Sequence, residues 1–217
     1  MKALVIRDYP KGVIGFFVLF YTVGVLGMIY EPTRSFFMSL TPLALLLSSF
    51  ALALFHRSVF GKKEALVFAA IVIFGYLVEV VGVNTGKIFG VYAYGDTLGL
   101  KAWETPFMIG LNWLLLVYTS AAMVQHFNVP RYLQPVVASL LMLGYDFILE
   151  PIAPRIDMWE WANDAAPLEN FIAWGLVAYI FHTVLLLSRI QIKNSLAIAI
   201  FILQILFFAH LYFLPTL

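Results

Sequence analysis

Seven long apolar segments dominate the sequence and restrict what it can fold into. A helix needs about 20 mostly apolar residues to cross the hydrocarbon core of a bilayer. Charged residues make up 12% of the chain, about half the usual share, and the mean hydropathy is +0.94. We therefore predict an all-α integral membrane protein, one transmembrane domain over residues 1–217. The predicted spans are residues 12–30, 35–55, 64–83, 105–125, 132–150, 168–188 and 194–214.

Two connections between these spans are long and rich in aromatic and polar residues, 84–104 and 151–167. The first also contains closely spaced glycines, which permit turns and close backbone approach. We expect it to fold back over the mouth of the bundle as a re-entrant cover. It lacks the G-x-x-x-x-G-K-[ST] pattern of a phosphate-binding loop. No inverted repeat and no broken helix pair is apparent, which argues against a transporter.

The distribution of lysine and arginine predicts the orientation. Nine of these residues lie on the amino-terminal side of the spans and four on the opposite side. Because cytoplasmic loops carry the excess of positive charge, we expect a multi-pass protein of the cell membrane with a cytoplasmic amino terminus. Both long connections then face outward. Ten of the twelve acidic residues also lie on that outer side.

Three acidic residues lie near the outer ends of apolar segments: Glu79, Asp146 and Glu150. Carboxylates are costly in a bilayer, and those that persist usually face the bundle interior or a wet cavity. Asp146 and Glu150 are four residues apart, so a helix places them on one face. Two such carboxyl groups repel when both are ionised, and one then keeps its proton to higher pH. A protonated acid beside a free base is suited to general acid–base catalysis.

Each acid also has a purely structural interpretation. Glu150 precedes a proline and can end its helix while pairing with Arg155, and Glu79 can pair with Lys87. The five tryptophans all map to the outer half, where such residues often anchor a protein at the interface. They are equally suited to line a cleft for a polyene or a carbocation.

Composition excludes several classes of function. The chain has no cysteine, and its four histidines are far apart, without metal-binding spacing. It cannot build the histidine cluster of a membrane di-iron oxygenase, so water is the expected source of any added oxygen. The last span has no lysine for a retinal Schiff base. A net charge of +1 gives no nucleic-acid footprint.

The central region of the chain carries a set of motifs. The set begins with Glu79-x-x-Gly82-x-x-Thr85-Gly86-x-x-Phe89-Gly90-x-Tyr92-x-Tyr94, followed by Leu98-Gly99, Pro106 and Trp113. It continues in Asp146-x-x-Leu149-Glu150-Pro151-x-Ala153 and Trp159-x-Trp161. Together these motifs resemble those of the membrane carotenoid hydratases of bacteria and archaea. Ile88 stands where such proteins carry proline before Phe-Gly.

The resemblance implies hydration of the terminal C1=C2 double bond of an acyclic (ψ) carotenoid end, without metal or cofactor. The chemistry of the residues suggests Asp146 and Glu150 as the acid–base pair, with Glu79 as the alternative acid. Asn112 and Tyr94 are predicted to position water, and Trp113, Trp159 and Trp161 to flank the cation and polyene. The predicted substrate-binding set also includes Phe89, Tyr92, Asn84, Glu104 and Arg155.

The expected partners are the carotenoid and membrane lipid, with no nucleic acid. Association with other enzymes of the carotenoid pathway is also expected. Two alternatives remain open: a carotenoid cyclase, which excludes water from the same cation, and a proton-coupled transporter that uses the acids as a relay.

Overall fold

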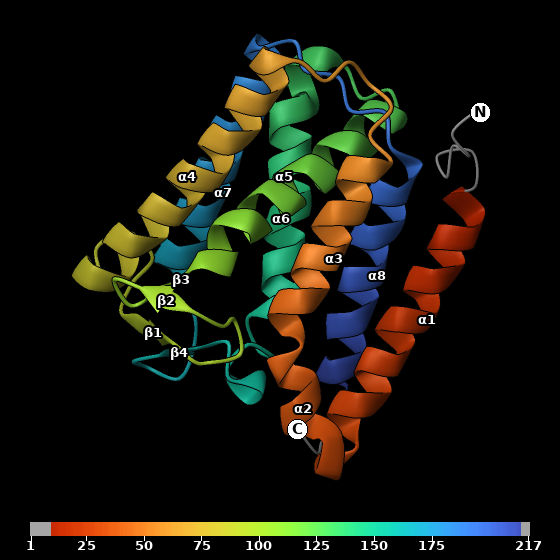
Figure 1. The fold of residues 1–217 in the computed structure, drawn as a ribbon. Helices are drawn as coiled ribbons and strands as arrows, with labels where there is room; N and C mark the ends of the chain where they lie inside the picture. The colour runs from red at the N-terminus through yellow and green to blue at the C-terminus, as the bar shows by residue number, and fades with distance from the viewer. Residues whose placement is uncertain (1–9, 214–217) are drawn as a thin grey trace.

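A computed structural model describes residues 10–213, and this part of the chain forms a bundle of eight α-helices (Figure 1). Six are long and apolar enough to cross a membrane, and a bent pair of helices supplies a seventh candidate. The predicted all-α membrane bundle is thus confirmed. The six helices are α1 (Pro10–Ile29), α4 (Lys62–Thr85), α5 (Phe107–His126), α6 (Gln134–Leu149), α7 (Leu168–Leu187) and α8 (Ser195–Tyr212).

The second span is broken. It consists of α2 (Glu31–Ser39) and α3 (Thr41–Leu54), which meet at Leu40 with a bend of 52°. Pro42 lies in the first turn of α3, where its missing N–H costs no helical hydrogen bond but would break a helix continuing from α2. The expectation that the chain has no broken helix pair is therefore wrong.

The helices alternate in direction, so the bundle has two distinct ends (Figure 1). The end where α1 begins carries the connections 55–61, 127–133 and 188–194. The opposite end carries α2 and both long connections. Of the nine cations predicted to be cytoplasmic, Lys2 and Arg7 lie outside the described residues, as does Leu214 at the end of the last predicted span.

Helices α4 and α5 approach each other closely because glycines face the contact. A Cβ at Gly75 would lie 2.7 Å from the Cβ of Trp113, and one at Gly110 would lie 2.6 Å from the carbonyl oxygen of Val72. Neither position has room for a larger residue. Glu79 follows Gly75 by one turn, so this packing also brings Glu79 beside Trp113.

Two small two-stranded sheets, absent from the predicted all-α fold, lie in this region, and the first of them joins the two long connections. Strand β1 (Tyr92–Tyr94) pairs in antiparallel register with β4 (Trp159–Trp161), and β2 (Lys101–Ala102) pairs with β3 (Thr105–Pro106). Figure 1 shows the strands gathered at the end of the bundle where α4 ends. The segment 84–104, which is predicted to form a re-entrant cover, thus contributes strands at the mouth of the bundle. The bent pair of helices, α2 and α3, lies outside this segment.

Candidate active site

The three predicted acids come from the ends of two helices. Glu79 lies on α4, Asp146 lies on the last turn of α6, and Glu150 directly follows α6. All three side chains are buried, and Asp146 is 0% exposed. Glu79 and Glu150, but not Asp146, line a cavity of about 10 Å³, which is the size of a single water site. Its lining consists of Glu79, Phe89, Tyr92, Tyr94, Ile109, Glu150, Trp159, Trp161, Asn170 and Trp174.

Strand alternation brings four aromatic side chains to this cavity. Along a strand, successive side chains point to opposite faces, so Tyr92 and Tyr94 share one face of β1. The register pairs Tyr92 with Trp161 and Tyr94 with Trp159, and all four rings face the acids. The ring centroids of Tyr92 and Trp161 are 5.0 Å apart. The middle residues of both strands point outward and are exposed.

Glu79 is held by three hydrogen-bond donors. Its Oε2 accepts from the hydroxyls of Tyr92 and Tyr94 at 2.7 and 2.8 Å. Its Oε1 accepts from the indole N–H of Trp113 at 2.9 Å. Burial raises the pKa of both tyrosines, so these phenols remain protonated donors. Glu79 therefore joins α4, α5 and β1 through one carboxyl group.

Glu150 also accepts three hydrogen bonds. Its Oε2 accepts from the indole N–H groups of Trp161 and Trp159 at 2.7 and 3.2 Å, and its Oε1 accepts from Asn170 at 3.1 Å. Burial raises the pKa of Glu150 and the three donors oppose that rise. The net direction is upward, which brings Glu150 closer to the range in which a carboxylate serves as a base near neutrality.

Asp146 has far fewer partners. Its Oδ2 accepts one hydrogen bond of 3.3 Å, from the same amide of Asn170 that contacts Glu150. Its Oδ1 is buried and has no hydrogen-bond partner. An ionised carboxylate in such a site would leave its charge almost unsolvated. Of the three acids, Asp146 is thus the one whose surroundings favour the protonated form.

Within residues 10–213, Glu150 does not form the predicted ion pair with Arg155, and Glu79 does not form one with Lys87. Arg155 donates to the carbonyl oxygens of Leu211 and Tyr212, at 3.4 and 3.5 Å. No lysine or arginine lines the cavity within residues 10–213. The acids therefore interact with neutral donors.

The structure places three predicted substrate-binding residues away from the cavity: Asn84, Glu104 and Arg155. Asn84 donates to the carbonyl oxygen of Trp103 at 3.0 Å and so ties the first connection to α4. Glu104 is exposed at the turn between β2 and β3. Arg155 bonds the end of α8, as described above. Trp103 is the exposed tryptophan, while the other four are buried.

Asn112 does not face the acids but lines an apolar groove of about 420 Å³, within the size range of ligand pockets. The groove and the acid cluster use neighbouring residues of α5 and α6. On α5, Asn112 faces the groove and Trp113 bonds Glu79. On α6, Tyr145 and Leu149 line the groove, each one residue before an acid. The other groove residues include Phe16, Phe20, Met28, Phe37, Leu45, Met158, Gln204 and Phe207.

Two residues of the site were missed from the sequence. Asn170 bridges Asp146 and Glu150, and Trp174 stacks on Trp113 with ring centroids 4.1 Å apart. They are four residues apart on α7 and so share a face. The signal in the sequence was an amide near the start of a mostly apolar helix. Within residues 10–213, no group of histidine and acidic side chains is arranged to hold a metal ion.

Fold and site together define a multi-pass, all-α membrane protein with buried acids capped by aromatic strands. The model of a known family, described as carotenoid biosynthesis protein, matches residues 40–214. The chain therefore belongs to the carotenoid biosynthesis protein family, and its role lies in that pathway. The matched region contains all three acids, both strands of the cap and every helix from α3 to α8. No curated protein and no solved structure matches the chain.

Proposed function

We propose that this protein is a carotenoid 1,2-hydratase, which adds water across the terminal C1=C2 bond of an acyclic carotenoid end. The observation that supports this most is the cavity between Glu79 and Glu150. It has the volume of one water molecule and is lined by several hydrogen-bonding groups, as a water site requires. The acid that favours its protonated form, Asp146, is linked to Glu150 through Asn170.

The three acids divide the reaction between them. Asp146 gives its proton to C2, so a C–H bond forms, the π bond breaks and a tertiary cation develops at C1. Water in the cavity bonds to C1 through its oxygen and gives a proton to Glu150. Transfer of that proton from Glu150 back to Asp146 restores the starting state. Glu79 keeps its negative charge near the cation, and the faces of Trp113, Trp159 and Trp161 add cation–π attraction.

The apolar groove is the proposed site for the polyene. A carotenoid is about as long as the hydrocarbon core is thick, roughly 30 Å, and it dissolves in that core. The groove has the volume to hold one end of such a molecule, with the rest in lipid. Its rim includes the exposed side chains of Phe16, Leu19 and Leu43, which face outward. Tyr145 and Leu149 line the groove and lie one and three residues from Asp146 on α6, so we place the reacting end near this proton donor.

Hydration is favoured over cyclisation by the same cavity. A cyclase must keep water from the C1 cation, whereas here a water-sized space lies between two carboxyl groups. The absence of a broken helix pair was one argument from the sequence against a transporter, and the bent pair α2–α3 removes that argument. The family match, however, gives the chain a role in biosynthesis rather than in transport.

Isotopic labelling tests the source of the new oxygen atom. Product formed in H₂¹⁸O should carry the label, and product formed under ¹⁸O₂ in ordinary water should not. The reason is that the proposed chemistry consumes water and needs no oxidant. Mass spectrometry of the hydroxylated carotenoid gives the result. Label arriving from O₂ would show an oxygenase and sink the proposal.

The pH profile tests the role of Glu150. Because its pKa is raised, the acid limb of kcat/KM should lie above the ordinary glutamate value of about 4.3. Activity is lost below that limb, where Glu150 is protonated and cannot accept a proton. Trp161→Phe removes a donor that lowers the pKa, so the limb should move to higher pH. Trp174→Phe removes an indole from the same cavity without a bond to Glu150 and should leave the limb unchanged. A limb that stays fixed in Trp161→Phe assigns the base to another group.

Labelling of single cysteines tests the proposed orientation, with the amino terminus in the cytoplasm and the acid cluster toward the outside. Leu100 and Val59 lie in connections at opposite ends of the bundle, and each is 84% exposed. The chain has no other cysteine. In intact cells, an impermeant thiol reagent should modify Leu100→Cys and spare Val59→Cys until the membrane is opened. The reverse pattern would place the acid cluster toward the cytoplasm.

A further inference from the structure

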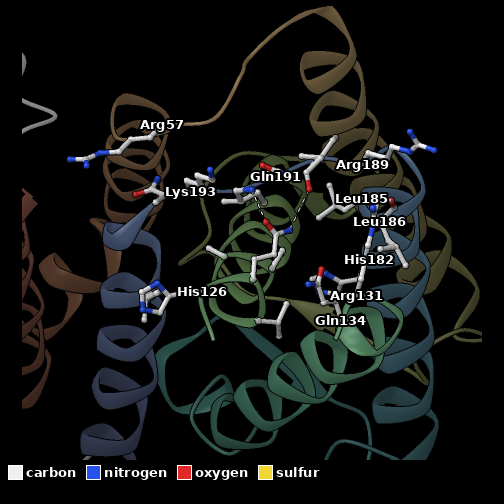
Figure 2. Close-up of a pocket in the computed structure, with 18 of the residues that line it drawn as sticks. Arg57, His126, Arg131, Gln134, His182, Leu185, Leu186, Arg189, Gln191 and Lys193 are labelled. Atoms are coloured by element: carbon white, nitrogen blue, oxygen red, sulfur yellow. Dashed lines mark hydrogen bonds between the residues drawn. The ribbon is translucent and has the colours of Figure 1, made fainter. Parts of the chain in front are cut away.

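A second cavity lies at the other end of the bundle, where α1 begins, and plays no part in the proposed chemistry. Its volume is about 820 Å³, and it lies among α5, α6, α7 and α8 and the connection 188–194 (Figure 2). Cationic and imidazole side chains line it, and no acidic side chain of residues 10–213 does. The members of this set are Arg57, His126, Arg131, His182, Arg189 and Lys193. We call it the basic cavity.

The floor of the basic cavity is built from polar side chains that already have partners. Gln125 accepts a hydrogen bond from the backbone N–H of Ile192 at 2.8 Å and donates to the carbonyl oxygen of Ile190 at 3.4 Å. Gln134 donates to the carbonyl oxygen of Val129 at 3.0 Å. His182 is buried, with its Nε2 3.2 Å from the Ser120 hydroxyl. These contacts hold the shape of the cavity.

The rim supplies the charge. Arg131 gives one hydrogen bond, to the carbonyl oxygen of Leu186 at 3.2 Å, and a guanidinium carries five N–H donors. Lys193 is exposed beside the start of α8. Figure 2 shows Arg57 and Arg189 on opposite sides of the cavity. Neither ion pair found within residues 10–213 involves Arg131, Arg189 or Lys193. The cavity therefore has a positive rim, and none of the acids among the described residues lies in its lining.

Apolar side chains complete the lining, among them Ala121, Leu185 and Ile198. The cavity thus combines cations with apolar surface at the ends of membrane-spanning helices, the depth at which lipid headgroups lie. Basic pockets between transmembrane helices bind anionic lipid headgroups for this reason. We propose that the basic cavity binds the phosphate group of an anionic ligand, with its apolar walls contacting the adjoining carbon chain.

The test uses the full-length protein purified in a neutral detergent. One arm measures the binding of phosphatidylglycerol and phosphatidylcholine by native mass spectrometry. A second arm measures the binding of inorganic pyrophosphate by calorimetry. The variant combines Arg131→Gln with Lys193→Gln. The matched control combines Lys11→Gln with Lys62→Gln, which removes two exposed cations from the same end without touching the cavity.

Phosphatidylglycerol should bind wild type and control alike, and the cavity variant about 30-fold more weakly, as expected for two lost cation–phosphate contacts. Phosphatidylcholine should bind more weakly than phosphatidylglycerol to the wild type. If pyrophosphate shows the same loss in the variant, the site also accepts a free phosphate compound, and the proposal stands with that source. Equal binding of both anions by variant and control would overturn it.

A second measurement needs no variant and covers the case in which the double substitution prevents folding. Anion affinity of the wild type should fall as salt is raised, because rim charges at this depth are screened. An affinity for phosphatidylglycerol that is independent of salt and equal to that for phosphatidylcholine would contradict a phosphate site.

Discussion

Asp146→Asn should lower turnover by at least about 100-fold, the usual contribution of a general acid, because the amide has no proton to give to C2. The substitution keeps the shape of the side chain and removes a carboxyl group that has one weak hydrogen bond of 3.3 Å. Folding and membrane insertion should therefore be unchanged. Turnover by purified protein, measured as hydroxylated product per unit time, gives the comparison.

Asp164→Asn is the matched control for this substitution. Asp164 lies in the second long connection with a φ of 61°, is exposed, and does not line the cavity. Asparagine tolerates that backbone conformation as well as aspartate does, so the control should keep full activity. Near-normal product from Asp146→Asn, together with a large loss in Glu79→Gln, would make Glu79 the proton donor.

Glu79→Ala should lower the free energy of unfolding by about 3 kcal/mol, because it leaves three buried donors without their acceptor. Those donors come from β1 and α5, so the aromatic cap should also detach from α4. Thermal unfolding in detergent measures the first effect. Hydrogen exchange over residues 86–106 measures the second and should become faster in the variant.

Glu160→Ala serves as the control for the cap. Glu160 is the middle residue of β4 and points away from the cavity, so the same change of side chain should cost little there. If Glu79→Ala unfolded at the temperature of the control and its cap exchanged no faster, the hydrogen bonds of Glu79 would not hold the cap.

The helices could be predicted well because the membrane imposes a simple pattern. Each predicted span overlaps its helix and ends within a few residues of it, apart from the second. There, Thr41-Pro42 lies inside the predicted span, and proline disfavours helix at the residue before it. The signal for the bend was thus present in the sequence.

The site could be predicted only in part. The acids stood out because carboxylates are rare in apolar spans, and the alternation in Tyr92-x-Tyr94 and Trp159-x-Trp161 was visible. The pairing of these two segments was not, because a register between strands so far apart in the chain depends on where α4 and α6 end. The bridging role of Asn170 could not be predicted for the same reason, because it depends on the position of α7 beside α6. Asn112 is predicted to position water at the acids. One residue along a helix corresponds to a rotation of 100°, however, so Asn112 faces the groove while its neighbour Trp113 bonds Glu79.

The mass of the product is the most direct test of the central claim. Purified protein, or a pigment-producing host that lacks other hydratases, would be supplied with a carotenoid bearing ψ ends, and the pigments separated and weighed by mass spectrometry. Hydration predicts a product heavier than its substrate by one water for each end that reacts. A product of unchanged mass with a ring at its end would show a cyclase and contradict the account.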